Sequence, residues 1–462
     1  MTIQRTISPV DQSVYVERPL ADGAAIQATL DRARAAQAAW RQVPLVERIA
    51  VVGRFIDAVL AHKPEIAEEI TWQMGRPIAQ SPGELGGFAE RARYMMDVAP
   101  EALADLRFDD KPGFTRFIRK LPVGVVFVIA PWNYPYLTAV NAVVPSILAG
   151  NAVILKHSAQ TPLTAERFAQ AFKEAGLPEG VFQYLHTGHA DALGIIRAGQ
   201  VNHVSFTGSV AGGHEIARAA GETFISTTLE LGGKDPGYVR PDADIRHAVE
   251  NLGDGAFFNS GQCCCGIERL YVHEAVYDAF IDGLVSFAAG YRLGNPTLPE
   301  VNIGPMAKAR SADFVRDQVA DAVAKGARAL VDAKSFPMDE RGSAYIAPQV
   351  LAGVDHNMSV MRVESFGPVV GVMKVKSDEE AIALMNDSPY GLTAAIWTSD
   401  PEAAERIGDR IETGTVFMNR CDYLDPALAW TGVKDTGRGV SLSRLAYDHL
   451  TRPKSFHLRT RI

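Results

Sequence analysis

The segment LPVGVVFVIAPWNYPYLTAVNAVVPSILAGNAVIL, residues 121–155, contains no Asp, Glu, Lys, Arg or His. A membrane span needs about 20 apolar residues in one uninterrupted helix, but prolines and asparagines break this segment repeatedly. It divides more naturally into an apolar strand (122–130), a helix (134–150) and a second strand (151–156). Strands that are apolar on both faces and joined by a helix are typical of a covered parallel sheet. The segment therefore predicts a buried βαβ unit, not a membrane anchor.

Strand and helix signals alternate in the rest of the chain as well. Before residue 100 the pattern is mostly helical, and the later predicted elements are strands at 180–186, 202–206, 226–231 and 267–273 and helices at 163–176, 210–220, 274–290 and 311–327. This alternation favours an α/β fold with two doubly wound lobes.

Composition narrows the function classes. The chain has 462 residues, of which 47% are hydrophobic and 22% charged, and its net charge is -8. These values exclude disorder and predict no nucleic-acid partner. Three of the four cysteines are adjacent, which argues against a disulfide scaffold. No signal peptide precedes the helical region, so we expect a cytoplasmic protein without a membrane anchor.

Two local patterns suggest chemistry. Thr207, Gly208 and Ser209 stand between a predicted strand and a predicted helix, where backbone N–H groups favour a phosphate, although a simple helix cap fits equally well. The run Cys263–Cys265 lies on an irregular segment, so one thiol can face a cleft while its neighbours pack. Its spacing matches no metal site. The alternatives are a nucleophile, with Glu230 as a candidate base, or ordinary packing, which is also the default for Cys421.

Five motifs together resemble the aldehyde dehydrogenase superfamily in order and spacing. They are PWNYP (131–135), FTGS (206–209), ELGGKDP (230–236), GQCCCG (261–266) and ESFGPV (364–369). The likeness covers nearly the whole chain, and the 34 residues from Glu230 to Cys264 fit the family's spacing between base and nucleophile.

The resemblance implies a mechanism. Cys264 is similar to the nucleophile that attacks the aldehyde, and Asn133 to the amide that stabilises the resulting oxyanion. Glu230 is similar to the base that activates water to hydrolyse the thioester. The structural alternatives are a turn-capping Asn133 and a Glu230 that merely ends a strand.

The cofactor implied by the resemblance is NAD or NADP. The residues similar to the family's cofactor contacts are Trp132, Lys156, Ser158, Ala159, Gly208, Ser209, Gly232, Glu364 and Phe366. Many NAD-dependent members have a glutamate where this chain has Ala159. Without that carboxylate, Lys156 and Ser158 are free to accept a 2′-phosphate, so NADP is plausible.

The substrate is less defined than the reaction. Relatives that act on succinate semialdehyde often have an arginine where this chain has Asn141, which argues against a dicarboxylate-type substrate. Tyr134, Asp422 and Tyr423 would make the entrance aromatic and acidic, which suits a cationic aminoaldehyde, unless they only pack. Other readings are a coenzyme A-acylating enzyme, which typically lacks the Glu230 base, a cysteine hydrolase, and a non-catalytic protein that keeps the fold.

The resemblance also implies the architecture. We expect a Rossmann-like cofactor domain (1–106 and 123–232), an α/β catalytic domain (233–432) and a small β oligomerisation element (107–122 and 433–462). The tail alternates polar and apolar residues, as an edge strand does. The expected assembly is a homodimer or a homotetramer, with no metal.

Overall fold

The computed structural model describes residues 2–421 and 423–462. The chain starts with a hairpin of β1 (Ile3–Ile7) and β2 (Val14–Pro19). Four helices follow: α1 (Gly23–Trp40), α2 (Leu45–Ala61), α3 (Lys63–Met74) and α4 (Ser81–Ala102). Asp22 caps helix α1. Its side chain accepts a hydrogen bond from the Ala25 N–H and so satisfies one free donor of the first turn.

A six-stranded sheet has the order β17-β9-β8-β5-β6-β7 and is parallel except for β17. Its strands are β5 (Val125–Ala130), β6 (Ala152–His157), β7 (Phe182–Tyr184), β8 (His203–Thr207), β9 (Ser226–Glu230) and β17 (Gly437–Arg438). The helices between them are α5 (Pro135–Ala149), α6 (Leu163–Glu174), α7 (His189–Arg197) and α8 (Val210–Ala220).

Both faces of this sheet are covered, as the apolar run predicts. Val126 and Val128 of β5 belong to the core under α2, α4 and α5, whereas Val125 and Phe127 belong to the core under α1, α7 and α8. Alternate side chains of one strand thus enter two different cores, which explains why the segment contains no charged residue.

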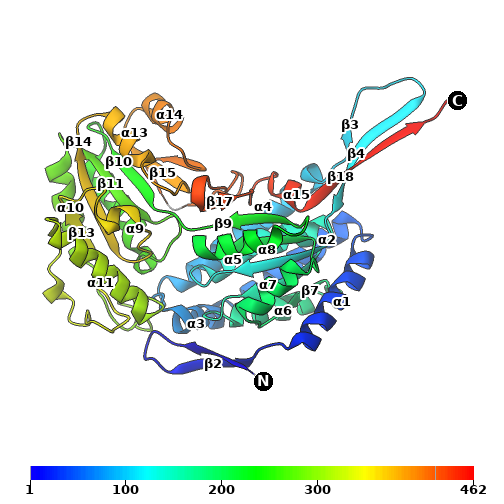
Figure 1. The fold of residues 1–462 in the computed structure, drawn as a ribbon, viewed down its shortest axis with the longest axis horizontal. Coiled ribbons are helices and arrows are strands. Elements are labelled where there is room, and N and C mark those ends of the chain that lie inside the picture. Colours follow the sequence, from blue (N-terminus) through cyan, green and yellow to red (C-terminus); the bar gives the residue numbers. More distant parts are fainter. Residues whose placement is uncertain (1, 422) are drawn as a thin grey trace.

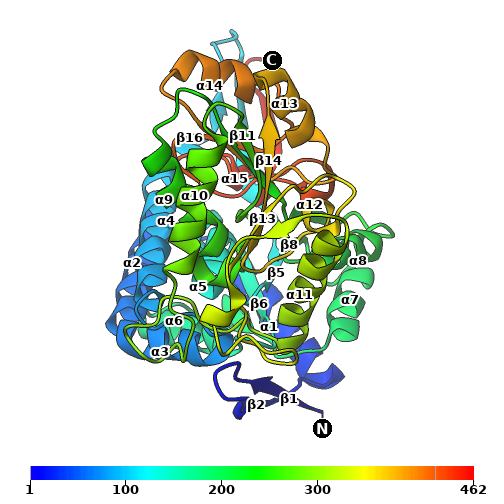
Figure 2. The same cartoon turned by 90° about the vertical axis from the view of Figure 1, so that its left-hand side faces the viewer.

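A seven-stranded sheet has the order β12-β13-β14-β11-β10-β15-β16, with only β12 antiparallel among the described strands. Figure 2 views the molecule from the side of this sheet, where β11, β13 and β14 are labelled. Its strands are β10 (Asp235–Val239), β11 (Ile267–His273), β12 (Arg328–Ala329), β13 (Gln349–Ala352), β14 (Val369–Val375), β15 (Thr393–Trp397) and β16 (Thr415–Met418). Its helices are α9 (Ile245–Phe257), α10 (Tyr277–Ala289), α11 (Ala309–Ala324), α12 (Ser359–Arg362), α13 (Asp378–Asn386) and α14 (Pro401–Gly408).

The two large sheets face each other across the middle of the molecule (Figure 1). The six-stranded sheet contributes the carboxyl ends of β5, β6 and β8, and the seven-stranded sheet contributes the segments that lead into β11 and β14. Ligands of open α/β sheets bind outside the carboxyl ends of the strands. The cleft between the sheets is therefore the expected binding region.

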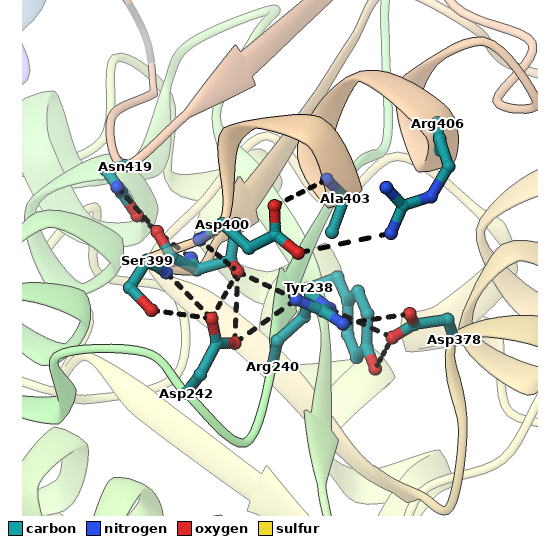
Figure 3. Close-up of polar contacts among 10 residues, drawn as sticks. Tyr238, Arg240, Asp242, Asp378, Ser399, Asp400, Ala403, Arg406 and Asn419 are labelled. Atoms are coloured by element: carbon teal, nitrogen blue, oxygen red, sulfur yellow. Dashed lines mark hydrogen bonds and ion pairs between the residues drawn. The ribbon is translucent and has the colours of Figure 1, made fainter.

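A polar network lies at the carboxyl ends of β10 and β15, two interior strands of the seven-stranded sheet (Figure 3). Arg240, which follows β10, donates from Nε to Asp378 at the start of α13 over 3.1 Å, and the Tyr238 hydroxyl donates to the same carboxylate over 2.8 Å. Asp242 accepts hydrogen bonds from Thr398 and Ser399 beyond β15. These contacts join the carboxyl ends of two neighbouring strands, so we assign the network a structural role.

A three-stranded antiparallel sheet projects from the body as an arm (Figure 1). It consists of β3 (Leu106–Arg107), β4 (Phe114–Pro122) and β18 (Thr451–Arg459), and α15 (Ala446–His449) precedes its last strand. The rings of Phe117 and Phe456 stack across the β4–β18 pair with centroids 4.5 Å apart.

The α/β fold is confirmed. The sequence pattern missed the β1–β2 hairpin, α7 and β10, and it predicted none of the strands β12 to β16 or the helices α12 to α14. The expected domain boundaries stay a prediction. The segments 107–122 and 451–459 do share the arm, whereas β17, which lies inside the expected bridging element, pairs with β9 of the six-stranded sheet.

Candidate active site

The cysteine run lies on an irregular segment between α9 and β11. A 3₁₀ turn (Phe258–Gly261) precedes it, with positive φ angles of 54° at Asn259 and 57° at Ser260. Cys263 and Cys265 are 9% and 2% exposed, and their Sγ atoms lie 3.4 Å apart. Cys264 is half-buried and lines both of the cavities described below, whereas Cys263 and Cys265 line only the smaller one, so the middle thiol is the most accessible of the three. Hydrogen bonding to the Cys263 thiol, together with burial, raises the pKa of Cys264.

Glu230 is the last residue of β9, and its side chain points into the same cavity. Its carboxylate accepts hydrogen bonds from the hydroxyls of Ser441 and Thr207, the latter over 3.4 Å. Burial raises the pKa of Glu230, and the Ser441 hydrogen bond opposes that shift. A carboxylate with a raised pKa is a stronger base than one in water, which suits proton abstraction.

Asn133 precedes α5 and is 4% exposed. The side-chain Nδ2 of Asn133 donates to the Gln262 backbone carbonyl over 3.2 Å, and the Asn133 backbone carbonyl accepts from the Arg76 guanidinium. Arg76 also pairs with Glu84, which accepts from the Tyr136 N–H over 2.7 Å at the start of α5. This buried ion pair holds the Asn133 backbone against the cysteine segment. The sequence reading missed it, because both partners lie about fifty residues or more before Asn133.

Two adjoining cavities meet at the cysteine. One of about 270 Å³ is lined by Asn133, Glu230 and Cys264 together with the sides of the central cleft. The other, of about 140 Å³, lies on the far side of Cys264 and Glu230 and is lined by both of them as well. The candidate nucleophile and base therefore stand at the junction of two spaces that would hold the two reactants.

A third cavity of about 880 Å³ continues from the first along the carboxyl ends of β5, β6 and β8. Its lining includes Trp132, Lys156, Ser158, Ala159, Gly208 and Ser209, all expected cofactor contacts. Ser209 caps α8 by accepting from the Gly212 N–H over 3.2 Å. This hydrogen bond is the helix cap that the sequence allows at this junction, and the phosphate site at the same place stays a prediction.

The residues of this cavity fit a dinucleotide. A Cβ atom at Gly212 would meet the Phe206 ring at 2.8 Å, so the first turn of α8 carries no side chain there to block a phosphate. Lys156 is 7% exposed, and burial lowers the pKa of its amine. The Lys156 Nζ donates only to the His157 carbonyl, over 3.5 Å, among the residues that the structure describes. A buried amine with so weak a partner gains from an anionic or hydroxylated ligand.

The remaining expected cofactor contacts gather where the two sheets meet. Glu364 accepts from the Gly233 N–H over 3.1 Å, and burial raises its pKa to about 8. A Cβ atom at Gly232 would lie 2.4 Å from the Glu364 carboxylate, which explains the glycine. Phe366 has a φ of 49° and meets the Trp132 ring edge to face, with centroids 5.7 Å apart.

A buried ion pair supports this loop and was also missed. Glu268 accepts from the N–H groups of Ser365 and Phe366 over 2.8 and 2.9 Å, and it pairs with Lys234 over 2.5 Å. Because Lys234 immediately follows the two glycines after Glu230, one contact connects the β9 turn, β11 and the Phe366 loop. In the sequence Lys234 is one of three charged residues in ELGGKDP (230–236), and nothing there marks Glu268 as its partner.

The residues expected to contact the substrate do not all line the same cavity. Tyr134 and Asn141 line the 140 Å³ cavity. Tyr423 does not line it, and its hydroxyl donates to Glu90 over 2.7 Å. Asp422 lies outside the described residues. The aromatic and acidic entrance expected from Tyr134, Asp422 and Tyr423 therefore stays a prediction. The charged residues in the described wall of this cavity are Glu230 and Arg91, and no motif in the sequence contains the arginine.

Comparison with known proteins gives consistent matches. The model of the aldehyde dehydrogenase family matches residues 2–456. A succinate-semialdehyde dehydrogenase [NADP(+)] from Deinococcus radiodurans is 33% identical over 449 residues, 97% of this chain and 93% of that protein. A probable betaine aldehyde dehydrogenase from Schizosaccharomyces pombe is 33% identical over 419 residues, 90% of this chain and 83% of that protein.

The fold matches solved structures equally well. Succinic semialdehyde dehydrogenase from Streptococcus pyogenes, solved with NADP+ as the cofactor, superimposes with a TM-score of 0.94 at 30% identity, covering 99% of this chain and 100% of that one. Across residues 2–421 and 423–462, no helix is both long and apolar enough to cross a membrane. Within the same residues, no cluster of three or more His, Cys, Asp or Glu side chains could hold a metal ion.

Proposed function

The chain belongs to the aldehyde dehydrogenase family, and we propose that it oxidises an aldehyde to the free carboxylic acid with NAD(P)+ and water. The enzyme class, an NAD(P)-dependent aldehyde dehydrogenase, follows from the family. The observation that supports hydrolysis is the position of Cys264 and Glu230, which both line the two cavities on either side of them.

Each residue has one role in the proposal. The Cys264 thiolate attacks the aldehyde carbon, and the Asn133 amide and the Cys264 backbone N–H donate hydrogen bonds to the oxyanion. A nicotinamide bound in the cleft would supply the hydride acceptor, and Cys264 would then carry the acyl group as a thioester. Glu230 then takes a proton from water, the hydroxide adds to the thioester, and the acid leaves as the thiol reforms.

The test follows NAD(P)H absorbance with short aliphatic aldehydes and either dinucleotide, in the absence of coenzyme A. Turnover that yields the free acid supports the proposal. Turnover only after coenzyme A is added would establish the acylating alternative. If both dinucleotides bind and no aldehyde reacts with or without coenzyme A, the non-catalytic alternative holds. If neither dinucleotide binds, the hypothesis of a cysteine hydrolase without a cofactor is favoured.

We further propose that the cofactor cleft accepts NADP because position 159 has no carboxylate to repel the 2′-phosphate. Ala159→Glu should lower the affinity for NADP relative to NAD about 100-fold, because a like charge facing a phosphate costs several kcal/mol. Titration of each dinucleotide by isothermal calorimetry measures the ratio.

Ala159→Gln is the matched control, since it adds the same bulk without the charge. The Ala159 carbonyl accepts from the Thr6 hydroxyl, and this backbone contact remains in both variants. An equal loss of NADP affinity in the glutamine variant would show that bulk, not charge, excludes NADP, and would contradict the prediction.

The arm carries a proposal for the assembly. Strand β18 lies at the edge of its sheet, and Leu106, Phe108 and Leu458 of the arm are 53%, 53% and 48% exposed. We propose that a second copy covers this surface in a homodimer or homotetramer. Light scattering, read against the 49.9 kDa chain, distinguishes the two. All four cysteines are free, which suits the proposed cytoplasmic location.

A further inference from the structure

Arg91 is a buried cation in the wall of the 140 Å³ cavity, next to the candidate nucleophile. It belongs to α4 and is 8% exposed. Its neighbours on the inward side of that helix are the buried residues Phe88, Ala92 and Met95. The cavity that Arg91 lines also contains Cys264 and Glu230, so its charge lies within the space where an aldehyde would react.

None of the hydrogen bonds that the structure gives Arg91 is to a carboxylate. Its Nη1 donates to the Leu137 carbonyl over 2.9 Å and to the Asn141 Oδ1 over 3.4 Å, both on α5. Among the residues that the structure describes, no carboxylate forms an ion pair with it, whereas the other buried arginine near the site, Arg76, is paired with Glu84. Burying a cation without an anion is costly, and proteins usually avoid it.

Arg91 is protonated and therefore positively charged. Burial lowers its pKa, and the nearby Cys265 and Glu230 oppose that shift. Arginine starts from so high a pKa that it stays charged in proteins. The cavity therefore holds a permanent positive charge at its wall, and an anionic ligand would satisfy it.

We propose that Arg91 binds the distal carboxylate of a short ω-carboxy aldehyde and so sets the substrate class of this enzyme. The inference rests on the proposed function of Cys264. The planar guanidinium forms paired hydrogen bonds with carboxylates, and with Nη1 held by α5 the rest of the group can receive one. A cavity of about 140 Å³ limits the chain between the two ends to a few carbon atoms.

The position of Arg91 changes what Asn141 implies about the substrate. From the sequence, the absence of an arginine at that position argued against an anionic substrate. In the structure the arginine comes from a different helix, and Asn141 accepts a hydrogen bond from it. A cationic aldehyde would meet a like charge at the same wall. The relatives named for succinate semialdehyde and for betaine aldehyde are both 33% identical to this chain, so percentage identity does not choose between an anionic and a cationic substrate.

The decisive measurement is the ratio of kcat/KM for succinate semialdehyde to kcat/KM for butanal, an uncharged aldehyde of the same length. Arg91→Leu should lower this ratio about 100-fold, mainly through KM, because a charge-assisted pair binds ground and transition states alike. Arg93→Leu is the matched control: it lies on the same helix, is 56% exposed and should keep the ratio.

Three results would overturn the proposal. The first is a wild-type enzyme that prefers butanal. The second is an Arg91→Leu enzyme that loses activity equally with both aldehydes. The third is a uniform loss in which the acid limb of the pH profile moves upward, since that would mean that Arg91 acts on the pKa of Glu230.

A binding measurement separates this inference from the proposed function. Succinate should raise the Tm of the wild type and of Arg93→Leu but not of Arg91→Leu, and butyrate should raise none of them as much. An equal shift in Arg91→Leu would refute the carboxylate site. If no aldehyde is oxidised, the proposed function fails, and the succinate shift still decides the role of Arg91.

Discussion

Cys264→Ala should abolish aldehyde oxidation, with a fall in kcat on the order of 10⁴-fold or more, because removing a covalent nucleophile leaves only binding and oxyanion stabilisation. Dinucleotide affinity should change little, since the large cavity that would hold most of the cofactor is not lined by Cys264. Steady-state NAD(P)H formation and calorimetric titration of the dinucleotide measure the two quantities.

The neighbouring thiols provide the controls. Cys263→Ala and Cys265→Ala remove atoms that pack against each other, so each should affect stability more than chemistry. Iodoacetamide should alkylate Cys264 first, because it is the half-buried member of the run, and peptide mass spectrometry locates the label. Loss of activity in Cys263→Ala or Cys265→Ala with retention in Cys264→Ala would move the nucleophile to a neighbour.

Strands could be predicted from the sequence where burial on both faces excludes charged residues. Strands β5 and β6 are buried on both faces, and a run without charge is the direct result. Strand β10 leaves no such mark, because it reads Asp-Pro-Gly-Tyr-Val and becomes a strand only by pairing with β11 and β15. Local propensity argues against it, and tertiary pairing overrides propensity.

The candidate site also contains residues that the sequence predicts and residues that it does not. Motifs predicted Cys264, Glu230 and Asn133, since each stands in a short recognisable segment. The groups that tune them come from remote segments: Ser441 bonds to Glu230 across 211 residues, and Arg91 bonds to Asn141 across 50. Arg91 left one readable signal, a charge between the apolar Phe88, Ala92 and Met95 of a helix face. Nothing in the sequence says what such a charge faces.

The pH dependence of kcat should reveal Glu230. The base must be deprotonated to act, and burial raises its pKa, so activity should rise with pH above the ordinary carboxyl range and reach a plateau once Glu230 is ionised. Ser441→Ala removes a hydrogen bond that stabilises the carboxylate, so the rising limb should move to higher pH. A limb that stays in place would contradict the assignment of Glu230 as the titrating group.

Glu230→Gln should stop the reaction after hydride transfer. Glutamine keeps the size of the side chain and its contacts with Ser441 and Thr207, but it cannot take a proton from water. Steady-state turnover should fall about 10²–10⁴-fold, the usual contribution of a general base. Stopped-flow absorbance should nevertheless show a burst of up to one NAD(P)H per active site, and intact-protein mass spectrometry should show an acyl group on Cys264.

Hydroxylamine distinguishes the two roles that Glu230 could have. Added to the gel-filtered acyl-enzyme, it attacks a thioester without a base, so it should release the hydroxamate from Glu230→Gln and nothing from Cys264→Ala. Because the pKa of Cys264 is itself raised, Glu230 could instead be needed to ionise the thiol. In that case the variant would show neither a burst nor an acyl adduct, and Glu230 would be assigned to thiol activation rather than to hydrolysis.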